Sequence, residues 1–269
     1  MNSQDVLVTD KRYELFGWDY DHINPLSPQE IAWYTKFVEY GGGSVLELAC
    51  GTGRLLAEMA KQGSKCVGID SSSTMLEIAK RHASTLSPEI SSRITLHKMD
   101  MIDLEFDEIF DLIILADNTF RIFTTREQQL SCLKCVYRHL APQGKFLVSV
   151  RRFDPARYPR GRRKFGWSEP VDHPRTKEVV MRRGEMTLLE GEKRMRSVFY
   201  YKIIHKDGSE SIEECSSEIS TLLTADFLSL FSEAKFCPSV YVGYEELEDD
   251  GENPILCFVC DKEQSIEGT

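Results

Sequence analysis

Short apolar runs alternate with amphipathic stretches through the middle of the chain. Such runs predict strands over residues 44–49, 65–70, 93–100, 110–116 and 144–150. Apolar residues spaced three and four apart predict helices over residues 53–63, 72–83 and 125–141, the last stopped before Pro142. Because strand–helix–strand units make right-handed crossovers, this order predicts a mostly parallel sheet with helices on both faces. The expected fold class is doubly wound α/β.

The segments before and after this region add further helices and strands to the predicted α/β domain. Ser27, Pro28 and Glu30 carry the signature of an N-cap, a first-turn proline and a capping box, and Gly41 to Gly43 follow, so a helix is predicted over residues 28–40. A later helix over 224–236 and strands over 239–246 and 254–261 bring the sheet to seven strands. Residues 1–26 have no sustained period, and we interpret them as an arm or lid.

After the fifth predicted strand, the alternation of strands and helices stops. A basic, proline-bearing stretch over 151–174 leads into strand-like segments at 178–191, 193–205 and 210–220, and the Asp207-Gly208 pair predicts a hairpin turn between the last two. We therefore expect two parts: a main domain from residues 1–150 and 220–263, which includes the arm, and a basic loop plus antiparallel β insertion over 151–219.

Charge and cysteine content narrow the class of protein. The net charge is −10, which disfavours broad attraction to nucleic acid. The start of the chain lacks the apolar core of a signal peptide and no run of about 18 apolar residues occurs, so a cytoplasmic location without a membrane span is expected.

Two cysteine pairs, Cys132/Cys135 and Cys257/Cys260, have a spacing found in zinc sites. The second pair lies in a predicted strand, where residues three apart point to opposite faces. We interpret the cysteines as small buried apolar residues and expect no metal.

The turn after the first strand and the end of the second carry the clearest chemistry. Gly51 and Gly53 let the backbone approach a ligand closely, and the helix that follows presents amides to a negative group. Asp70 ends the second strand, where a carboxylate can accept hydrogen bonds from both hydroxyls of a ribose. Together they predict a nucleotide or nucleoside site.

The stretch Glu47-Leu-Ala-Cys-Gly-Thr-Gly-Arg54 decides between nucleotide classes. Leu56 stands where a dinucleotide motif has its third glycine, which counts against a nicotinamide or flavin. The stretch resembles the first motif of the class I S-adenosylmethionine-dependent methyltransferases, with Ala49 in place of the first glycine. The resemblance covers approximately residues 28–150 and the last strands, and it implies a Rossmann-like fold with S-adenosylmethionine as cofactor.

The same resemblance implies roles for other residues. Asp70 would hold the ribose, Asp100 the adenine amino group with Met101 against the ring, and Ala116, Asp117 and Asn118 would line the methionine part and the acceptor. The cofactor-binding residues predicted in this way are Glu47, Ala49, Gly51, Gly53, Asp70, Ser71, Met75, Asp100, Met101, Ala116 and Asn118.

The sequence defines the acceptor site less clearly than the cofactor site. We expect a small-molecule acceptor chosen by the β insertion. Tyr20 and His22 could form a lid, Phe120 and Phe123 belong to either pocket or core, and Arg152 or Arg157 could bind an anionic acceptor. His22 and His173 are the candidate general bases, although solvated surface histidines are commoner, so no general base is assigned.

Three alternatives stay open. The protein could be a non-catalytic regulatory protein that binds the cofactor, or a methyltransferase with a macromolecular acceptor. Methylation of nucleic-acid bases is disfavoured because no Asn-Pro-Pro-Tyr type motif follows the fourth strand. A nicotinamide oxidoreductase is the third alternative.

Overall fold

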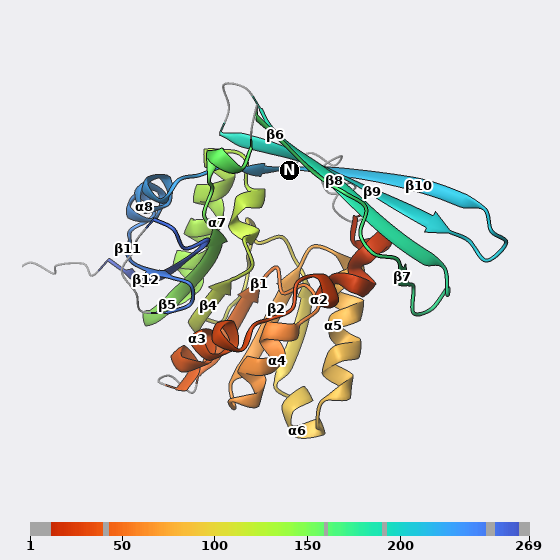
Figure 1. Cartoon of the computed structure of the whole chain (residues 1–269). Helices are drawn as coiled ribbons and strands as arrows, with labels where there is room; N and C mark the ends of the chain where they lie inside the picture. The colour runs from red at the N-terminus through yellow and green to blue at the C-terminus, as the bar shows by residue number, and fades with distance from the viewer. Residues whose placement is uncertain (1–11, 40–42, 159–160, 190–192, 246–250, 264–269) are drawn as a thin grey trace, which may run out of the picture.

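A seven-stranded sheet forms the centre of the protein. The computed structural model describes residues 12–39, 43–158, 161–189, 193–245 and 251–263. The strands run in the order β11-β12-β5-β4-β1-β2-β3 (Figure 1). Strands β1 to β5 are parallel neighbours, while β12 is antiparallel to both β5 and β11. The strand bounds are Ser44–Leu48 (β1), Lys65–Asp70 (β2), Ile94–Lys98 (β3), Phe110–Leu115 (β4), Leu140–Arg151 (β5), Phe236–Val242 (β11) and Ile255–Lys262 (β12). The predicted doubly wound α/β fold is confirmed.

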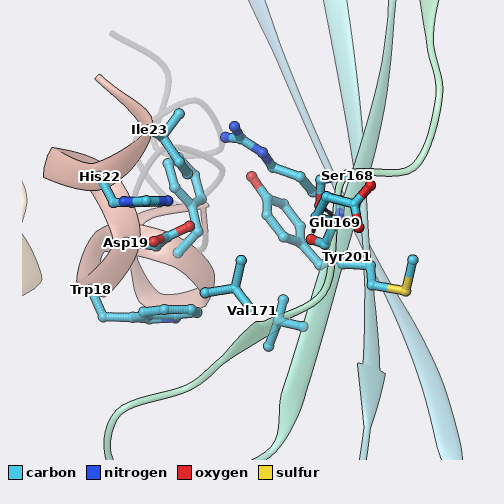
Figure 2. A pocket seen from close by; sticks show the side chains of 12 residues that line it. Trp18, Asp19, His22, Ile23, Ser168, Glu169, Val171 and Tyr201 are labelled. Atoms are coloured by element: carbon cyan, nitrogen blue, oxygen red, sulfur yellow. Dashed lines mark hydrogen bonds between the residues drawn. The ribbon is translucent and has the colours of Figure 1, made fainter. Parts of the chain in front are cut away.

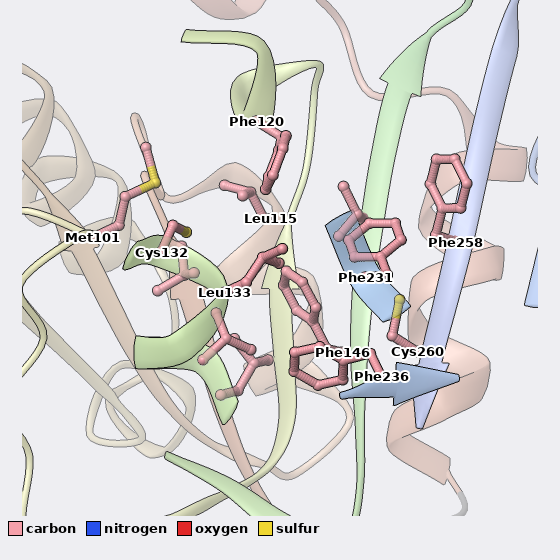
Figure 3. Packing of buried hydrophobic residues seen from close by; sticks show 14 of the residues in the cluster. Met101, Leu115, Phe120, Cys132, Leu133, Phe146, Phe231, Phe236, Phe258 and Cys260 are labelled. Carbon is pink, nitrogen blue, oxygen red and sulfur yellow. The ribbon is translucent and has the colours of Figure 1, made fainter. Parts of the chain in front are cut away.

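Helices cover both faces of this sheet. Side chains of α3 and α4 pack with Leu112, Ile114 and Leu147 on one face. On the other face α7 and α8 build a larger core rich in phenylalanine (Figure 3). Cys257 and Cys260 of β12 belong to opposite cores, as expected for residues three apart in a strand. The helix bounds are Pro28–Glu39 (α3), Arg54–Lys61 (α4), Ser73–Thr85 (α5), Pro88–Ser91 (α6), Arg126–His139 (α7) and Thr224–Glu233 (α8).

Three helix predictions need correction or restriction. Helix α8 ends at Glu233 rather than 236, and Phe236 already begins β11. Helix α7 ends at His139 rather than 141, because Leu140 is already extended (φ −84°, ψ 136°) and begins β5. The residue before a proline avoids the helical region, so Ala141 could not continue the helix into Pro142. Helix α3 is described to Glu39, and Tyr40 with Gly41 and Gly42 lies outside the described residues.

A second sheet follows β5 in the chain. Its order is β10-β9-β8-β6, with β7 also paired to β8, and every pairing is antiparallel. The three long strands and the turn at residues 206–209 agree with the prediction. The strand bounds are Arg162–Phe165 (β6), Val171–Asp172 (β7), Val179–Leu188 (β8), Arg194–Ile204 (β9) and Glu210–Ser220 (β10).

The sequence predicts that the basic stretch is a loop, but part of it forms a strand. Arg162 to Phe165 pair with Gly184 to Thr187 as the edge strand β6. Charged side chains are common on edge strands, where they face water and discourage pairing with other chains. The division of the chain at residues 151 and 219 stays a prediction.

One arginine connects the points where the chain leaves and rejoins the seven-stranded sheet. Arg121 lies in the short helix η2 (Thr119–Ile122) after β4 and is 3% exposed. Its guanidinium donates to the carbonyl oxygens of Arg151 (2.8 Å), Ser220 (3.0 Å) and Leu222 (2.9 Å). The exit and the return of the second sheet are therefore held together at one place. Among the described residues, no helix is both long and apolar enough to cross a bilayer.

Candidate cofactor and acceptor site

The turn after β1 has a left-handed backbone at three positions. Ala49, Gly51 and Gly53 have φ values of 51°, 54° and 72°. A Cβ on Gly53 would lie 3.2 Å from Cβ of Ala79, and one on Gly51 would lie 3.3 Å from Cε of Met75. Both contacts are with helix α5, so these glycines let the turn pack closely against that helix as well as adopt its backbone conformation.

Asp70 ties this turn to the start of α5. Its Oδ2 accepts a hydrogen bond from the backbone N–H of Gly51 (2.9 Å) and its Oδ1 from that of Ser72 (2.8 Å). The N-cap of α5 is Ser72 rather than Asp70, because the Ser72 hydroxyl accepts from Met75 N. Asp70 is 8% exposed, and a carboxylate oxygen can accept more than one hydrogen bond.

The residues expected around the nucleoside lie near the ends of β2 and β3. Ser71 is half-buried beside Asp70, and Met75 is buried on α5. Asp100 is half-buried and accepts from the N–H of Ile102 (3.2 Å), while Met101 is 6% exposed and belongs to the larger core. Their roles toward an adenine stay predictions.

The end of β4 holds two strained residues in succession. After the half-buried Ala116, Asp117 and Asn118 have φ values of 53° and 66°, a region that non-glycine residues rarely occupy. The Asn118 side chain accepts from Arg151 N (2.9 Å), which fixes the turn to β5. Strain of this kind persists where the surroundings enforce it and is frequent at functional sites.

Sequence reasoning missed Arg54, which follows the glycine turn directly. Its Nη2 donates to Oδ2 of Asp117 (2.9 Å), and its guanidinium lies 5.2 Å from the ring centre of Tyr20. Its Nη1 is buried without a hydrogen-bond partner among the described residues. The signal available was a basic residue at the start of an amphipathic helix, where the macrodipole favours the opposite charge.

Glu47 presents a second buried polar atom of the same kind. It is 5% exposed, and its Oε2 has no hydrogen-bond partner among the described residues. Burial raises the pKa of Glu47 to about 8, against the lowering effect of Arg54. Unpaired buried polar atoms are costly, so this edge is suited to a ligand that supplies the missing partners.

The N-terminal arm lies between this edge and the second sheet (Figure 1). It includes the short helices η1 (Gly17–Asp19) and α2 (Tyr20–Ile23). Phe16 stacks on Tyr201 of β9 with ring centres 5.4 Å apart. On the other side the Tyr20 hydroxyl donates to Asp117 (2.9 Å), and Thr52 donates to Asp21 (2.6 Å).

A cavity of about 250 Å³ opens between the arm and the second sheet. Figure 2 shows the arm side chains on one wall and those of the second sheet region on the other. The lining is amphipathic and includes Trp18, Asp19, His22, Ile23, Ser168, Glu169, Val171, Arg182 and Tyr201. His22 is thus near a cavity, as the lid interpretation requires, but it is exposed.

A second cavity of about 160 Å³ lies at the ends of β4 and β5. Ile23 of the arm lines both cavities, so they are adjacent. The charged and polar residues that line it come from six separate parts of the chain: Asn24, Glu30, Arg54, Asp117, Asn118, Ser149, Arg151 and Tyr244.

The structure separates the two interpretations of the aromatic residues after β4. Phe120 and Phe123 are 0% and 1% exposed, and Phe120 packs against Phe227 and Phe231 of α8. Both therefore belong to the core, and we no longer consider them acceptor contacts.

The other expected acceptor residues have protein partners. Arg152 donates from Nε to the carbonyl of Asn253 (3.0 Å), and Arg157 pairs with Asp154 (3.5 Å). His173 Nδ1 accepts from the N–H groups of Arg175 and Thr176, and burial lowers its pKa. His173 thus stabilises a turn, and Arg151 of this segment lines the second cavity.

Part of the chain matches a known protein family. Residues 45–144 match the family model described as a methyltransferase domain. The cypemycin N-terminal methyltransferase of a Streptomyces species is 28% identical over 130 residues, which cover 48% of this chain and 50% of that protein. The chain spans about half the length of the curated relatives it matches.

Solved structures show the same fold over more of the chain. An S-adenosylmethionine-dependent methyltransferase from Clostridium acetobutylicum has a TM-score of 0.75 at 16% identity, over 94% of this chain and 100% of that one. The amino pentose methyltransferase CalS10 of Micromonospora echinaspora, solved with bound S-adenosylmethionine, has a TM-score of 0.68 at 16% identity, over 90% of this chain and 94% of that one.

The chain therefore contains a methyltransferase domain at residues 45–144, and its fold is that of solved S-adenosylmethionine-dependent methyltransferases. S-adenosylmethionine, the cofactor that the sequence predicts, is the one bound in such a structure. The edge of the sheet fits this cofactor because it combines the Asp70 carboxylate with two buried polar atoms, Arg54 Nη1 and Glu47 Oε2, that have no hydrogen-bond partner within the described part of the chain.

Proposed function

We propose that this protein transfers a methyl group from S-adenosylmethionine to a small-molecule acceptor. The observation that carries the proposal is the arrangement at the carboxyl edge of β1, β2 and β4. Asp70 is held against the glycine turn, and Arg54 with Asp117 lies one strand further along the sheet. This order matches a ligand with a ribose at one end and a charged amino-acid group at the other.

Each residue then has a defined task. Asp70 accepts hydrogen bonds from the ribose hydroxyls, with Ser71 and Met75 beside it, and Asp100 and Met101 receive the adenine. The free Nη1 of Arg54 pairs with the carboxylate of the methionine part. When bound, the cofactor supplies an electrophilic methyl group on a sulfonium, so the protein has to orient an acceptor rather than activate a carbon.

The arm and the second sheet are the parts that recognise the acceptor. Tyr20 and His22 cover the site from the arm, and the amphipathic cavity in Figure 2 accommodates the body of a small molecule. An anionic group on the acceptor would meet Arg151 at the second cavity. The cypemycin enzyme is named for the N-terminus of cypemycin, and CalS10 for an amino pentose.

Two measurements test the proposal. Calorimetry with S-adenosylhomocysteine and with NAD should show binding of the first alone, and binding of NAD instead would support an oxidoreductase. Purified protein is then incubated with S-adenosylmethionine carrying a labelled methyl group and a cell extract divided by ultrafiltration. Label in the low-molecular-weight fraction supports the proposal, label in the retained fraction supports a macromolecular acceptor, and binding without transfer supports a regulatory protein.

A further inference from the structure

Glu30 does not complete the capping box that the sequence predicts. Its backbone N–H donates to the Ser27 hydroxyl (3.0 Å), which is half of that motif. The carboxylate instead accepts a hydrogen bond from the hydroxyl of Tyr244 (2.8 Å), which lies just after β11. Glu30 is 9% exposed and lines the second cavity. A carboxylate is thus directed to the cavity from a position where a surface cap was expected.

In the part of the chain that the structure describes, no basic side chain forms an ion pair with the Glu30 carboxylate, and Arg54 already donates to Asp117. Burial raises the pKa of Glu30, Asp117 raises it further, and the Tyr244 hydrogen bond and Arg54 lower it. The titratable or charged groups that face Glu30 are Tyr34, Glu47, Arg54, Asp117, Tyr244 and Cys257. A buried carboxylate without a cation is costly, so a cationic ligand group is favoured beside it.

The position of the cavity relates Glu30 to methyl transfer. Along the sheet edge the order is β2 with Asp70, β1 with the glycine turn, β4 with Asp117, and then β5. A cofactor that starts with its ribose at Asp70 and continues toward Asp117 brings its reactive end to this cavity. Ser149 and Arg151 of β5, which lies beyond β4 in the strand order, also line this cavity.

We propose that Glu30 binds an amino group of the acceptor and takes up the proton that the nitrogen loses. This proposal rests on the proposed methyltransferase function and specifies its substrate class as a primary or secondary amine. The bound ammonium first loses a proton to the Glu30 carboxylate, which Tyr244 holds in place. The lone pair thus freed forms the new N–C bond while the C–S bond breaks and its electron pair stays on sulfur. The methylated nitrogen takes over the positive charge of the sulfonium, and the proton passes from Glu30 to water.

The test uses binding to the full-length protein saturated with S-adenosylhomocysteine. The probes are cyclohexylamine, which is protonated at neutral pH, and cyclohexanol, which has nearly the same shape without the charge. Ligand-observed NMR gives the affinity of each for the wild type, for Glu30→Gln and for Glu58→Gln. The last variant is the control, since Glu58 pairs with Lys61 on the surface of α4.

We expect cyclohexylamine to bind the wild type and Glu58→Gln alike, with cyclohexanol weaker, and Glu30→Gln to lose roughly tenfold or more in amine affinity. S-adenosylhomocysteine affinity should be the same in all three proteins. Equal binding of amine and alcohol, or amine binding unchanged in Glu30→Gln, would overturn the proposal. Weaker S-adenosylhomocysteine binding in Glu30→Gln would also overturn it, by assigning Glu30 to the cofactor. A wild type that does not bind S-adenosylhomocysteine would instead refute the proposed function.

Discussion

The central strands of the seven-stranded sheet and the strands of the second sheet differ in how deeply their residues are buried. In β1 and β4 nearly every residue is buried, because helices cover both faces. In β8 and β9 most residues are only half-buried. The first region therefore fixes backbone turns with little freedom, which suits a cofactor shared by a whole class. The second presents side chains that can change without loss of the core, which suits recognition of a particular acceptor.

The family comparison divides the molecule in the same way. The matched residues, 45–144, include the glycine turn and Asp70 and end before β6. Nothing in that match describes the second sheet, which the structural neighbours share only as a fold at 16% identity. Substitutions in the two regions should therefore have separable effects on cofactor binding and on stability.

The largest effect is expected at the glycine turn. Gly53→Val places a β-branched residue at a φ of 72° with its Cβ 3.2 Å from Cβ of Ala79, so the turn must move. Calorimetry should show that S-adenosylhomocysteine affinity falls roughly a hundredfold or more. The matched control is Gly208→Val in the second sheet, which has a φ of 84° and open space around it. This control should lose stability and keep the affinity, and an equal loss in both variants would contradict the comparison.

A smaller loss is expected for Asp70→Ala. Two backbone hydrogen bonds and the proposed ribose contact disappear, so cofactor affinity should weaken by roughly 1.5–3 kcal/mol in calorimetry. Asp207→Ala is the control, because Asp207 likewise accepts from a backbone N–H, that of Ser209 (2.9 Å), but in the hairpin of the second sheet. Unchanged affinity in a folded Asp70→Ala variant would exclude the ribose role.

The pH dependence of stability should depend on Glu47. Its ordinary pKa is 4.5 and burial raises it to about 8, so between these values the folded protein holds a proton that the unfolded chain releases. The free energy of unfolding therefore falls as pH rises through this window. From about pH 5 to about pH 8, the melting temperature of the wild type should drop by ~3 °C or more beyond that of Glu47→Gln. Parallel pH curves for the two proteins in calorimetric scans would show that Glu47 is ionised when folded.

The smallest effect is expected on the surface of the second sheet. Glu218 on β10 pairs with Arg194 (3.0 Å) and Arg196 (2.8 Å) of β9, both partly exposed. Because exposed ion pairs are screened, Glu218→Gln should cost only ~0.5 kcal/mol in urea unfolding and leave S-adenosylhomocysteine affinity unchanged. A loss of affinity in this variant would mean that the two regions are coupled.

The sequence predicted the parts of the fold that depend on local pattern. The segment 65–70 is a strand with the predicted bounds, because five of its residues are buried and Asp70 ends it. Strand β6 was missed because its charged residues resemble a loop, and only pairing with β8 makes it a strand. The end of α7 was missed by two residues because the pairing of Leu140 with Phe110 begins before Pro142.

The parts of the site that follow from local sequence order were predictable, and those that depend on distant residues were not. Asp70 and the glycine turn are adjacent in the structure because they end neighbouring parallel strands, which the sequence order already implied. The environments of Phe120 and Glu30 depend on residues more than a hundred positions away, Phe227 and Tyr244. Such long-range partners leave no periodic signal, so Phe120 was assigned to two alternatives and Glu30 to a helix cap.

The hydrogen bonds of Arg121 to the two ends of the second sheet segment affect how that segment could change in evolution. Because Arg151 and Ser220 both reach one guanidinium, everything between them begins and ends at a single point on the main sheet. Recombination or duplication within the gene could therefore replace the segment between Arg151 and Ser220 with one of another length, while β4 and β5 keep their register. A laboratory graft would follow the same rule: a donor segment needs ends that meet this arginine, whatever its interior. Descendants of one ancestral enzyme could acquire new acceptors in this way without rebuilding the site of the methyl donor.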